Sequence, residues 1–313
     1  MRRHAAILLD SAERKKVHES IRRMYELCLC CIGGDNALEH DSKSVVGGMA
    51  LSPLTASRCM LDYNRTAAFS RGLRDAIAEM RRRRSGKKVN VLYAGCGPLA
   101  TLALPQTMHF SPNEVEFTLL DVHENALECC RILAEALGTE EYFSRCIEDD
   151  ATRYVHEGPP PDVIVVEAMN KCLLREPQAA ITANLASQLA PDGIFLPRRI
   201  SVNAYLEDAA PKRTPLGSVV ELTKEFAAHV REVGLDRALQ VDEILALPHP
   251  LPCAEPNLVL GTSVEVFGPH ALPEGSSIIT MDRRHPDAIE EDTNLRIRFT
   301  LGDIFLRVLY TES

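Results

Sequence analysis

Two glutamates nine positions apart lie in a setting that suits chemistry on a cation. Glu167 directly follows the apolar run DVIVV, and Glu176 directly precedes Pro177. If DVIVV is a strand, its carboxyl end lies at the ligand-binding edge of a parallel sheet, and the intervening loop can fold back so that both carboxylates face one site. Alternatively, both are ordinary loop acids, or Glu176 caps a helix that begins at Pro177.

Paired carboxylates are suited to binding a guanidinium group. This group is planar, stays protonated and has five N–H donors, so carboxylates recognise it best in bidentate geometry. Two carboxylates would also hold positive charge on one side of the guanidinium and leave the target nitrogen more available for attack on a methyl group held in line. We therefore predict that Glu167 and Glu176 act together on one cationic substrate.

A glycine-rich turn further upstream indicates a nucleoside-containing cofactor. Gly95 and Gly97 belong to GCGPLA, which follows the strand-like run VNVLYA. Glycines at these positions allow a tight turn and let a ligand approach the backbone at the start of a helix. Asp121 ends the next predicted strand, EFTLLD, where its carboxylate can accept hydrogen bonds from two ribose hydroxyls. NAD and S-adenosylmethionine both satisfy this pattern.

The residues inside the turn favour S-adenosylmethionine. Nicotinamide enzymes usually have three small residues there, which make room for the pyrophosphate, whereas this turn contains Pro98 and Leu99. Asp150, in the run EDDA after the third predicted strand, could accept a hydrogen bond from an adenine amino group. A nicotinamide oxidoreductase remains the alternative.

The elements that must position these residues alternate between strand and helix. From Val89 to about residue 200, short β-branched runs are interleaved with helical patterns, which predicts an α/β, doubly wound, Rossmann-like sheet. Helical periodicity covers residues 11–31 and about 55–84, with a polar, glycine-containing stretch at 33–48. After Pro197, short strands such as SSIITM and LRIRFTL lie between proline- and glycine-rich turns, with a helical insertion near 218–239. We predict an N-terminal helical segment and lid (1–55), a cofactor-binding domain (56–197) and an antiparallel, barrel-like β domain (198–313).

Composition limits the partners and the compartment. The chain has 313 residues and a formal net charge of −9, which disfavours nucleic acid and favours small cationic partners. It contains neither an uncharged apolar run long enough to cross a membrane nor a visible secretory signal. Its ten cysteines fit free thiols in a reducing cytoplasm, and the Cys28-x-x-Cys31 pair has no second ligand pair at zinc-finger spacing, so we expect no metal.

Three motifs together are similar to those of a known family. The pattern E-x-M-x-x-C-L-x-x-E resembles the double-glutamate loop of the protein arginine methyltransferases, including Met169 between the acids. The run YAGCGPLATLAL resembles the first motif of class I S-adenosylmethionine methyltransferases, and its GPL is closer to the symmetric-dimethylating branch. The run MLDYNRT looks like the helical segment whose arginine holds the cofactor's carboxylate. The likeness covers about residues 56–208.

The resemblance implies a set of roles. The cofactor would be S-adenosylmethionine, bound by Arg65, Gly95, Gly97, Asp121 and Asp150. Glu167 and Glu176 would be catalytic, and they would bind the substrate guanidinium together with Met169. The family also implies a homodimer.

Two departures from the family bear on the substrate. The usual Thr-His-Trp loop has no counterpart, since the chain contains no tryptophan, and the part after Pro197 is short. The added N-terminal segment through Gly48 could close the pocket as a lid. We therefore predict a small-molecule enzyme that methylates free L-arginine, or a small guanidino compound, for natural product biosynthesis. Protein arginine is the alternative substrate, and a non-catalytic scaffold is the alternative from another class.

Overall fold

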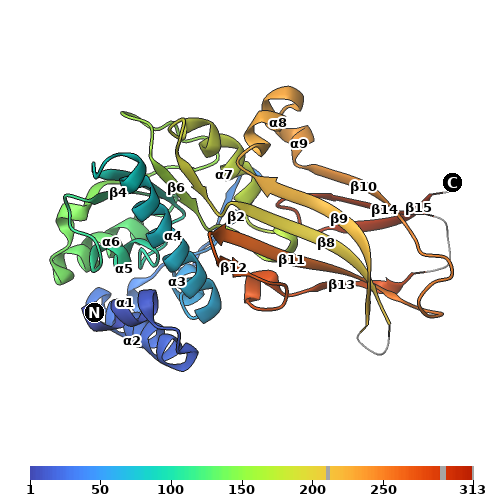
Figure 1. The fold of residues 1–313 in the computed structure, drawn as a ribbon, viewed down its shortest axis with the longest axis horizontal. Coiled ribbons are helices and arrows are strands. Elements are labelled where there is room, and N and C mark those ends of the chain that lie inside the picture. Colours follow the sequence, from blue (N-terminus) through green and yellow to red (C-terminus); the bar gives the residue numbers. More distant parts are fainter. Residues whose placement is uncertain (209–211, 290–293, 312–313) are drawn as a thin grey trace.

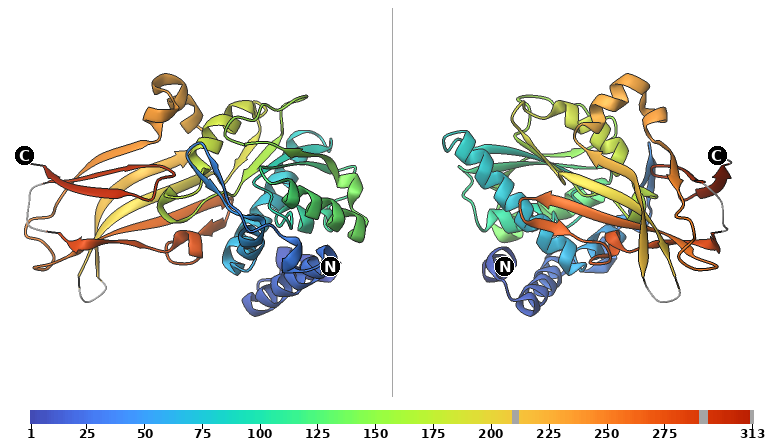
Figure 2. Two further views of the ribbon diagram at one scale, coloured as in Figure 1. Left: turned by 180° about the vertical axis from the view of Figure 1, so that it is seen from behind. Right: turned by 45° about the vertical axis from the view of Figure 1, so that its right-hand side comes forward.

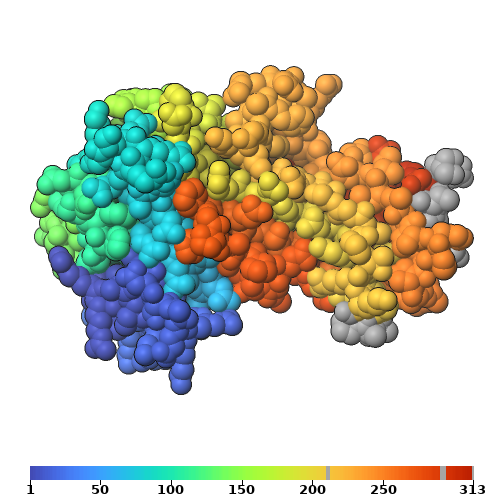
Figure 3. Space-filling view, in the orientation of Figure 1, coloured from blue at the N-terminus to red at the C-terminus, as the bar shows by residue number. Residues whose placement is uncertain are grey.

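The computed structural model describes residues 1–208, 212–289 and 294–311. The described chain forms an α/β part followed by an elongated β part (Figures 1 and 3). In the space-filling view, the two N-terminal helices form a lobe at one corner of the α/β part (Figure 3). No helix in the described ranges is long and apolar enough to cross a membrane.

The α/β part is built on a five-stranded parallel sheet in the order β5-β4-β3-β6-β7. Its strands are β3 (Val89–Ala94), β4 (Val115–Asp121), β5 (Phe143–Glu148), β6 (Val163–Val166) and β7 (Ile194–Leu196). The chain order reverses between β3 and β6, and ligands bind at such a switch point, outside the carboxyl ends of the strands. The predicted doubly wound sheet is confirmed.

Helices cover both faces of this sheet. The helices of the α/β part are α1 (Arg2–Asp10), α2 (Arg14–Ile32), α3 (Pro53–Cys59), α4 (Tyr63–Arg83), α5 (Ala103–Thr107), α6 (Glu124–Leu137) and α7 (Gln178–Leu185). Apolar residues of α4 and α6 pack with one face of β3, β4 and β6, whereas those of α7 pack with the other. Because both faces are covered, β3, β4 and β6 are almost entirely buried apolar strands. Helices α1 and α2 pack outside this core, on α4 and α6.

The helix predicted at about 55–84 is divided into α3 and α4. The break lies at residues 60–62, where the Asp62 carboxylate accepts a hydrogen bond from the Arg65 N–H and starts α4. Ser52 caps α3 in the same way, with Pro53 in its first turn. The helical periodicity continues across the break, so only the caps reveal it.

The β part is antiparallel throughout its described pairings, as predicted, with its strands divided between two sheets. One contains β8 (Arg199–Glu207), β9 (Arg213–Thr223), β11 (Asn257–Phe267), β12 (His270–Leu272) and β13 (Arg283–Ala288). The other contains β10 (Gln240–Ala246), β14 (Asn294–Thr300) and β15 (Leu306–Thr311). The helical insertion is α8 (Phe226–Val233) and α9 (Leu235–Ala238), a shorter span than predicted because β9 extends through Thr223. The strand predicted at SSIITM is wrong, because Ser277 and Thr280 form a capping box around a 3₁₀ turn.

A small β-hairpin lies between the two parts. It consists of β1 (Lys43–Val45) and β2 (Gly48–Ala50), and Figure 2 shows it reaching from the N-terminal helices toward the β sheets. The Met49 N–H donates to the Arg175 carbonyl over 2.9 Å, which ties the hairpin to the loop that ends at Glu176. The sequence indicated only a polar loop, because three-residue strands are too short to show periodicity.

Candidate active site

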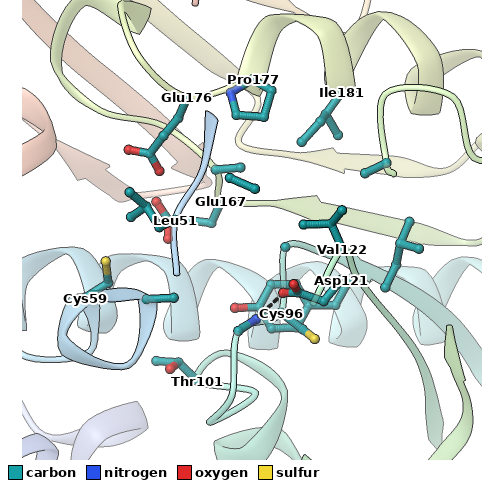
Figure 4. A pocket seen from close by; sticks show the side chains of 18 of the residues that line it. Leu51, Cys59, Cys96, Thr101, Asp121, Val122, Glu167, Glu176, Pro177 and Ile181 are labelled. Atoms are coloured by element: carbon teal, nitrogen blue, oxygen red, sulfur yellow. Dashed lines mark hydrogen bonds between the residues drawn. The ribbon is translucent and has the colours of Figure 1, made fainter. Parts of the chain in front are cut away.

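One pocket, with a cavity volume of about 100 Å³, lies at the carboxyl ends of the parallel strands. Figure 4 shows Glu167, Glu176 and Leu51 near one end and Asp121 with Cys96 near the other. All of its described lining residues fall between Val45 and Ile181, so none comes from the β part. Among the residues that the structure describes, the hairpin and the α/β part therefore form the pocket.

The glycine turn and Asp121 form one end of the pocket. Gly95 (φ +71°) and Gly97 (φ +60°) have left-handed backbone conformations, which glycine adopts without steric cost. The Gly97 N–H donates to Asp121 Oδ2 over 2.9 Å, and the His123 N–H donates to Oδ1 over 3.0 Å. Oδ2 keeps a free lone pair, whereas Oδ1 also lies 3.4 Å from His123 Nδ1, so the buried Asp121 is held in place and can still accept a hydroxyl donor.

The turn is not followed by the helix that the sequence indicated. Helix α5 begins only at Ala103, and irregular turns connect it to Gly97. Pyrophosphate binding in dinucleotide folds depends on a helix N-terminus directly at the glycine turn. The local structure therefore fits a nucleoside without a pyrophosphate better than NAD.

Asp150 lines this end of the pocket, as predicted, but its carboxylate already has local partners. Its Oδ1 accepts hydrogen bonds from the backbone N–H (2.9 Å) and the hydroxyl (2.7 Å) of Thr152. Asp149, which the sequence motifs did not indicate, lines the pocket beside it. Either carboxylate could accept from an adenine amino group.

Glu167 and Glu176 both line the other end. One Glu167 oxygen, Oε2, forms an ion pair with the Arg65 guanidinium, whereas Oε1 is buried without a hydrogen-bond partner in the described structure. The Glu176 carboxylate is also buried and has no hydrogen-bond donor among the described residues. Buried polar atoms are normally paired, so an orphaned acceptor beside a partnerless carboxylate marks a place for a cationic ligand.

Burial controls the protonation of both acids. It raises the pKa of Glu176 from 4.5 to about 7, and the charge of Arg65 opposes this shift. Burial also raises the pKa of Glu167, again opposed by Arg65. Strongly shifted carboxyl groups that face a cleft are typical of functional sites.

Arg65 lies in the first turn of α4, where it lines the pocket and is 7% exposed. The MLDYNRT motif predicts a contact with the cofactor's carboxylate, whereas in this structure Arg65 contacts Glu167. A guanidinium has five N–H donors, so this pairing leaves donors for a second carboxylate.

Met169 does not lie where a substrate contact would be. Its side chain is completely buried and is not among the pocket-lining residues. It therefore points from the loop into the main apolar core. Conversely, the pocket includes Cys59 of α3, Tyr93 of β3 and Met49 of the hairpin, which sequence reasoning missed. Tyr93 and Cys59 fit ordinary apolar patterns, and no sequence signal separates them from core residues.

The β part contacts the helix of Arg65 without the aromatic loop that the family resemblance implied. The Ser277 hydroxyl donates to Asp62 Oδ2 over 2.6 Å, and the Ile278 N–H donates to the same oxygen over 2.8 Å. Asp62 thus caps α4 and fixes the junction between the two parts.

No cluster of three or more His, Cys, Asp or Glu side chains suited to a metal ion occurs within residues 1–208, 212–289 and 294–311. All ten cysteines are free thiols.

Comparisons with known proteins identify the fold. No family model matches this sequence. No curated protein is significantly similar to it in sequence. Among solved structures, a chain of the Trypanosoma brucei PRMT1 enzyme-prozyme heterotetrameric complex with AdoHcy is similar with a TM-score of 0.50 and 11% identity, covering 78% of this chain and 86% of that one. Protein arginine methyltransferase 10 of Arabidopsis thaliana, in an open conformation, is similar with a TM-score of 0.54 and 14% identity, covering 77% of this chain and 86% of that one. At these identities the likeness establishes the shared fold, a Rossmann-like core joined to an antiparallel β domain.

Proposed function

We propose that this chain is an S-adenosylmethionine-dependent N-methyltransferase that methylates a guanidinium, with free L-arginine or another small guanidino compound as substrate. One observation carries the proposal: an orphaned Glu167 oxygen and the partnerless carboxylate of Glu176 share a pocket with the glycine turn and Asp121. Two solved structures with this fold are named as arginine methyltransferases, one of them in complex with AdoHcy, which supports this reading.

The residues at the Asp121 end fit the cofactor. Asp121 would accept from the ribose hydroxyls, because each of its oxygens has only one backbone donor. Asp150 or its neighbour Asp149 would accept from the adenine amino group, and Arg65 would donate to the cofactor's carboxylate. When bound, S-adenosylmethionine supplies a methyl group made electrophilic by the adjacent sulfonium.

The two glutamates would orient the guanidinium and hold its charge. Glu167 Oε1 and the Glu176 carboxylate are acceptors that a guanidinium would satisfy, and their burial strengthens the electrostatic interaction. Methylation of a guanidinium nitrogen releases one proton. Glu176, with its pKa raised to about 7, is suited to accept it at a carboxylate oxygen.

The hairpin supports a small substrate over a protein. Val45 and Met49 line the pocket, and a Cβ added at Gly48 would lie only 2.7 Å from the Arg175 carbonyl and 2.8 Å from the Glu176 carbonyl carbon. The hairpin backbone thus lies directly against the second glutamate, where an extended peptide would need an open groove. Protein arginine is the second candidate, favoured by the names of the two solved structures.

The charges of the pocket refine the choice of substrate. Arg65 is the only cationic side chain among its described lining residues, and Glu167 already pairs with it. The lining therefore offers no second cation to a substrate carboxylate. For this reason agmatine, which lacks the carboxylate of arginine, should be assayed beside it.

A non-catalytic scaffold is disfavoured by the energetics of the same acids. The partnerless carboxyl of Glu176 and the unpaired oxygen of Glu167 both cost stability, and a scaffold would gain nothing from either. We further propose a homodimer in a reducing cytoplasm, without nucleic acid or membrane partners, acting in natural product biosynthesis. The free cysteines and the net charge of −9 support the compartment and the absence of nucleic acid.

Two measurements test the proposal. S-adenosylhomocysteine, but not NAD, should raise the melting temperature, because a ligand that binds only the folded state stabilises it. Labelled S-adenosylmethionine should then transfer its methyl group to arginine or agmatine faster than to a basic peptide. Transfer to the peptide alone would establish the protein substrate, and stabilisation by NAD alone would overturn the assignment.

A further inference from the structure

The loop between the two glutamates has an unusual backbone conformation. Cys172 (φ 60°, ψ 17°) and Leu173 (φ 56°) are both in the left-handed region, although neither is glycine. Residues that have a side chain rarely adopt this backbone conformation, and consecutive non-glycine residues keep it only where their surroundings impose it. Some contact must therefore hold the loop.

The β part supplies that contact. The Cys172 N–H donates to Thr262 Oγ1 over 2.9 Å, and the Thr262 hydroxyl donates to Cys172 Sγ over 3.6 Å. Thr262 lies in β11 and is completely buried. The next residue of the loop is held by the backbone, because the Gly302 N–H donates to the Leu173 carbonyl over 2.7 Å. Of the two left-handed residues, Cys172 is thus held by β11 and Leu173 by the turn at Gly302.

Besides the Cys172 thiol, which donates to the Leu260 carbonyl of β11 over 3.8 Å, two further anchors lie closer to the ends of the loop. The Ala168 N–H donates to Gln178 Oε1 over 3.0 Å, and the Met49 N–H donates to the Arg175 carbonyl. Between these points, the exposed Lys171 ammonium reaches the Asp282 carbonyl over 3.3 Å. Thr262 is therefore the buried side chain that holds the middle of the loop.

We propose that Thr262 is a positioning residue: through the Cys172 N–H it holds the left-handed turn that brings Glu167 and Glu176 to one pocket. This inference rests on the proposed function. It explains how the β part influences the chemistry although none of its described residues lines the pocket. Thr262 acts through the loop and does not touch the substrate.

The variant Thr262→Val removes the hydroxyl of Thr262 and keeps the shape of its side chain. In Thr262→Val the Cys172 N–H loses its acceptor, so kcat with arginine or agmatine should fall by about tenfold or more, the effect of losing one buried hydrogen bond. The Kd for S-adenosylhomocysteine should stay within about twofold of wild type, since the glycine turn and Asp121 are untouched. Thr262→Ser keeps the hydroxyl and should restore most of kcat.

Thr107→Val is the matched control. Thr107 is also a buried threonine with a hydrogen-bonded hydroxyl, but that hydroxyl donates to the Leu104 carbonyl over 2.8 Å within α5, away from the loop. If Thr107→Val lowered kcat as much as Thr262→Val, or if Thr262→Ser failed to restore kcat, the positioning role would be overturned.

A second readout does not depend on methylation. The Cys172 thiol is completely buried, so release of the loop should increase its labelling by a thiol reagent in the folded protein, measured by peptide mass spectrometry. Unchanged labelling in Thr262→Val, with kcat retained, would overturn only this inference. A wild-type chain that methylates no guanidino compound would instead overturn the proposed function, and the catalytic part of the inference with it.

Discussion

Arg65 and Glu167 form a buried ion pair inside the pocket, with side chains only 8% and 10% exposed, and the pair uses only one oxygen of the carboxylate. The two residues come from the first turn of α4 and the end of β6. The pairing compensates the negative charge of Glu167 while Oε1 stays free to accept from a cation. Arg65 thus links the end of the pocket assigned to the cofactor with the end assigned to the substrate.

The first prediction concerns this ion pair. Arg65→Met leaves Glu167 buried without a cation, which should lower the free energy of unfolding by about 3 kcal/mol. It should also raise the Kd for S-adenosylhomocysteine at least about tenfold, as the loss of a charge-assisted hydrogen bond implies. The double variant Arg65→Met/Glu167→Gln should recover most of the stability and none of the affinity, measured by denaturant unfolding and calorimetry. Wild-type affinity in Arg65→Met would remove Arg65 from the cofactor site.

The second prediction concerns the paired acids. Glu167→Gln and Glu176→Gln each keep the shape and one acceptor but remove the charge, so kcat should fall by about 10² or more. Binding of S-adenosylhomocysteine should survive in both. In the double variant the loss of kcat should be much smaller than the product of the two single losses, because both acids act on one cation. Single variants that retain more than about half of the turnover would exclude the guanidinium clamp.

The third prediction is a pH dependence caused by Glu176. Only its carboxylate form attracts a guanidinium, so kcat/KM should rise with pH through about 7. Glu176→Gln should lose this rise, whereas a mutation outside the pocket should keep it. A wild-type profile that is flat between pH 6 and 8 would contradict the assignment of the raised pKa to a substrate-binding group.

The fourth prediction is the matching change in stability. The folded-state pKa of Glu176, about 7, lies above its ordinary value of 4.5, so the folded chain binds more protons in this interval. Its contribution to stability is therefore complete below about pH 4.5 and is lost as the pH rises through about 7. Without ligand, Glu176→Gln should be more stable than wild type at pH 8, by on the order of 1–3 kcal/mol. Equal melting curves at pH 8 would show that Glu176 is less buried than in this structure.

The fifth prediction tests the hairpin. Gly48→Ala would force a Cβ against the backbone of Arg175 and Glu176, so the hairpin should move away from the second glutamate. We expect a higher KM for arginine and agmatine, and faster methylation of a basic peptide relative to wild type. Gly217→Ala is the control, because its φ of +141° is close to the +153° of Gly48 and its Cβ would meet only Leu245 Cδ2 at an ordinary 3.5 Å, so it shares the backbone strain without the clash. If Gly48→Ala and the control variant both kept the wild-type ratio between the methylation rates of arginine and of the basic peptide, the hairpin would not determine substrate size.

The sequence by itself determined the parallel sheet and the edge at which the site lies. The β-branched runs before Gly95, Asp121 and Glu167 are buried strands, and in a parallel sheet the carboxyl ends of all strands meet at one edge. These residues could therefore be placed together before any contact was known. The nature of the turn at Gly95 and Gly97 was also readable, since a left-handed backbone favours glycine.

Tertiary structure decided the contacts between segments that local patterns do not connect. The pairing of Arg65 with Glu167, and the hydrogen bond from Cys172 to Thr262, join residues about a hundred positions apart. The hairpin is too short to be stable alone and exists because it packs between the loop and the β part. Met169 matched a family motif, yet its side chain packs into the core, because the direction of a loop side chain is set by the elements around it and not by its spacing from the two glutamates.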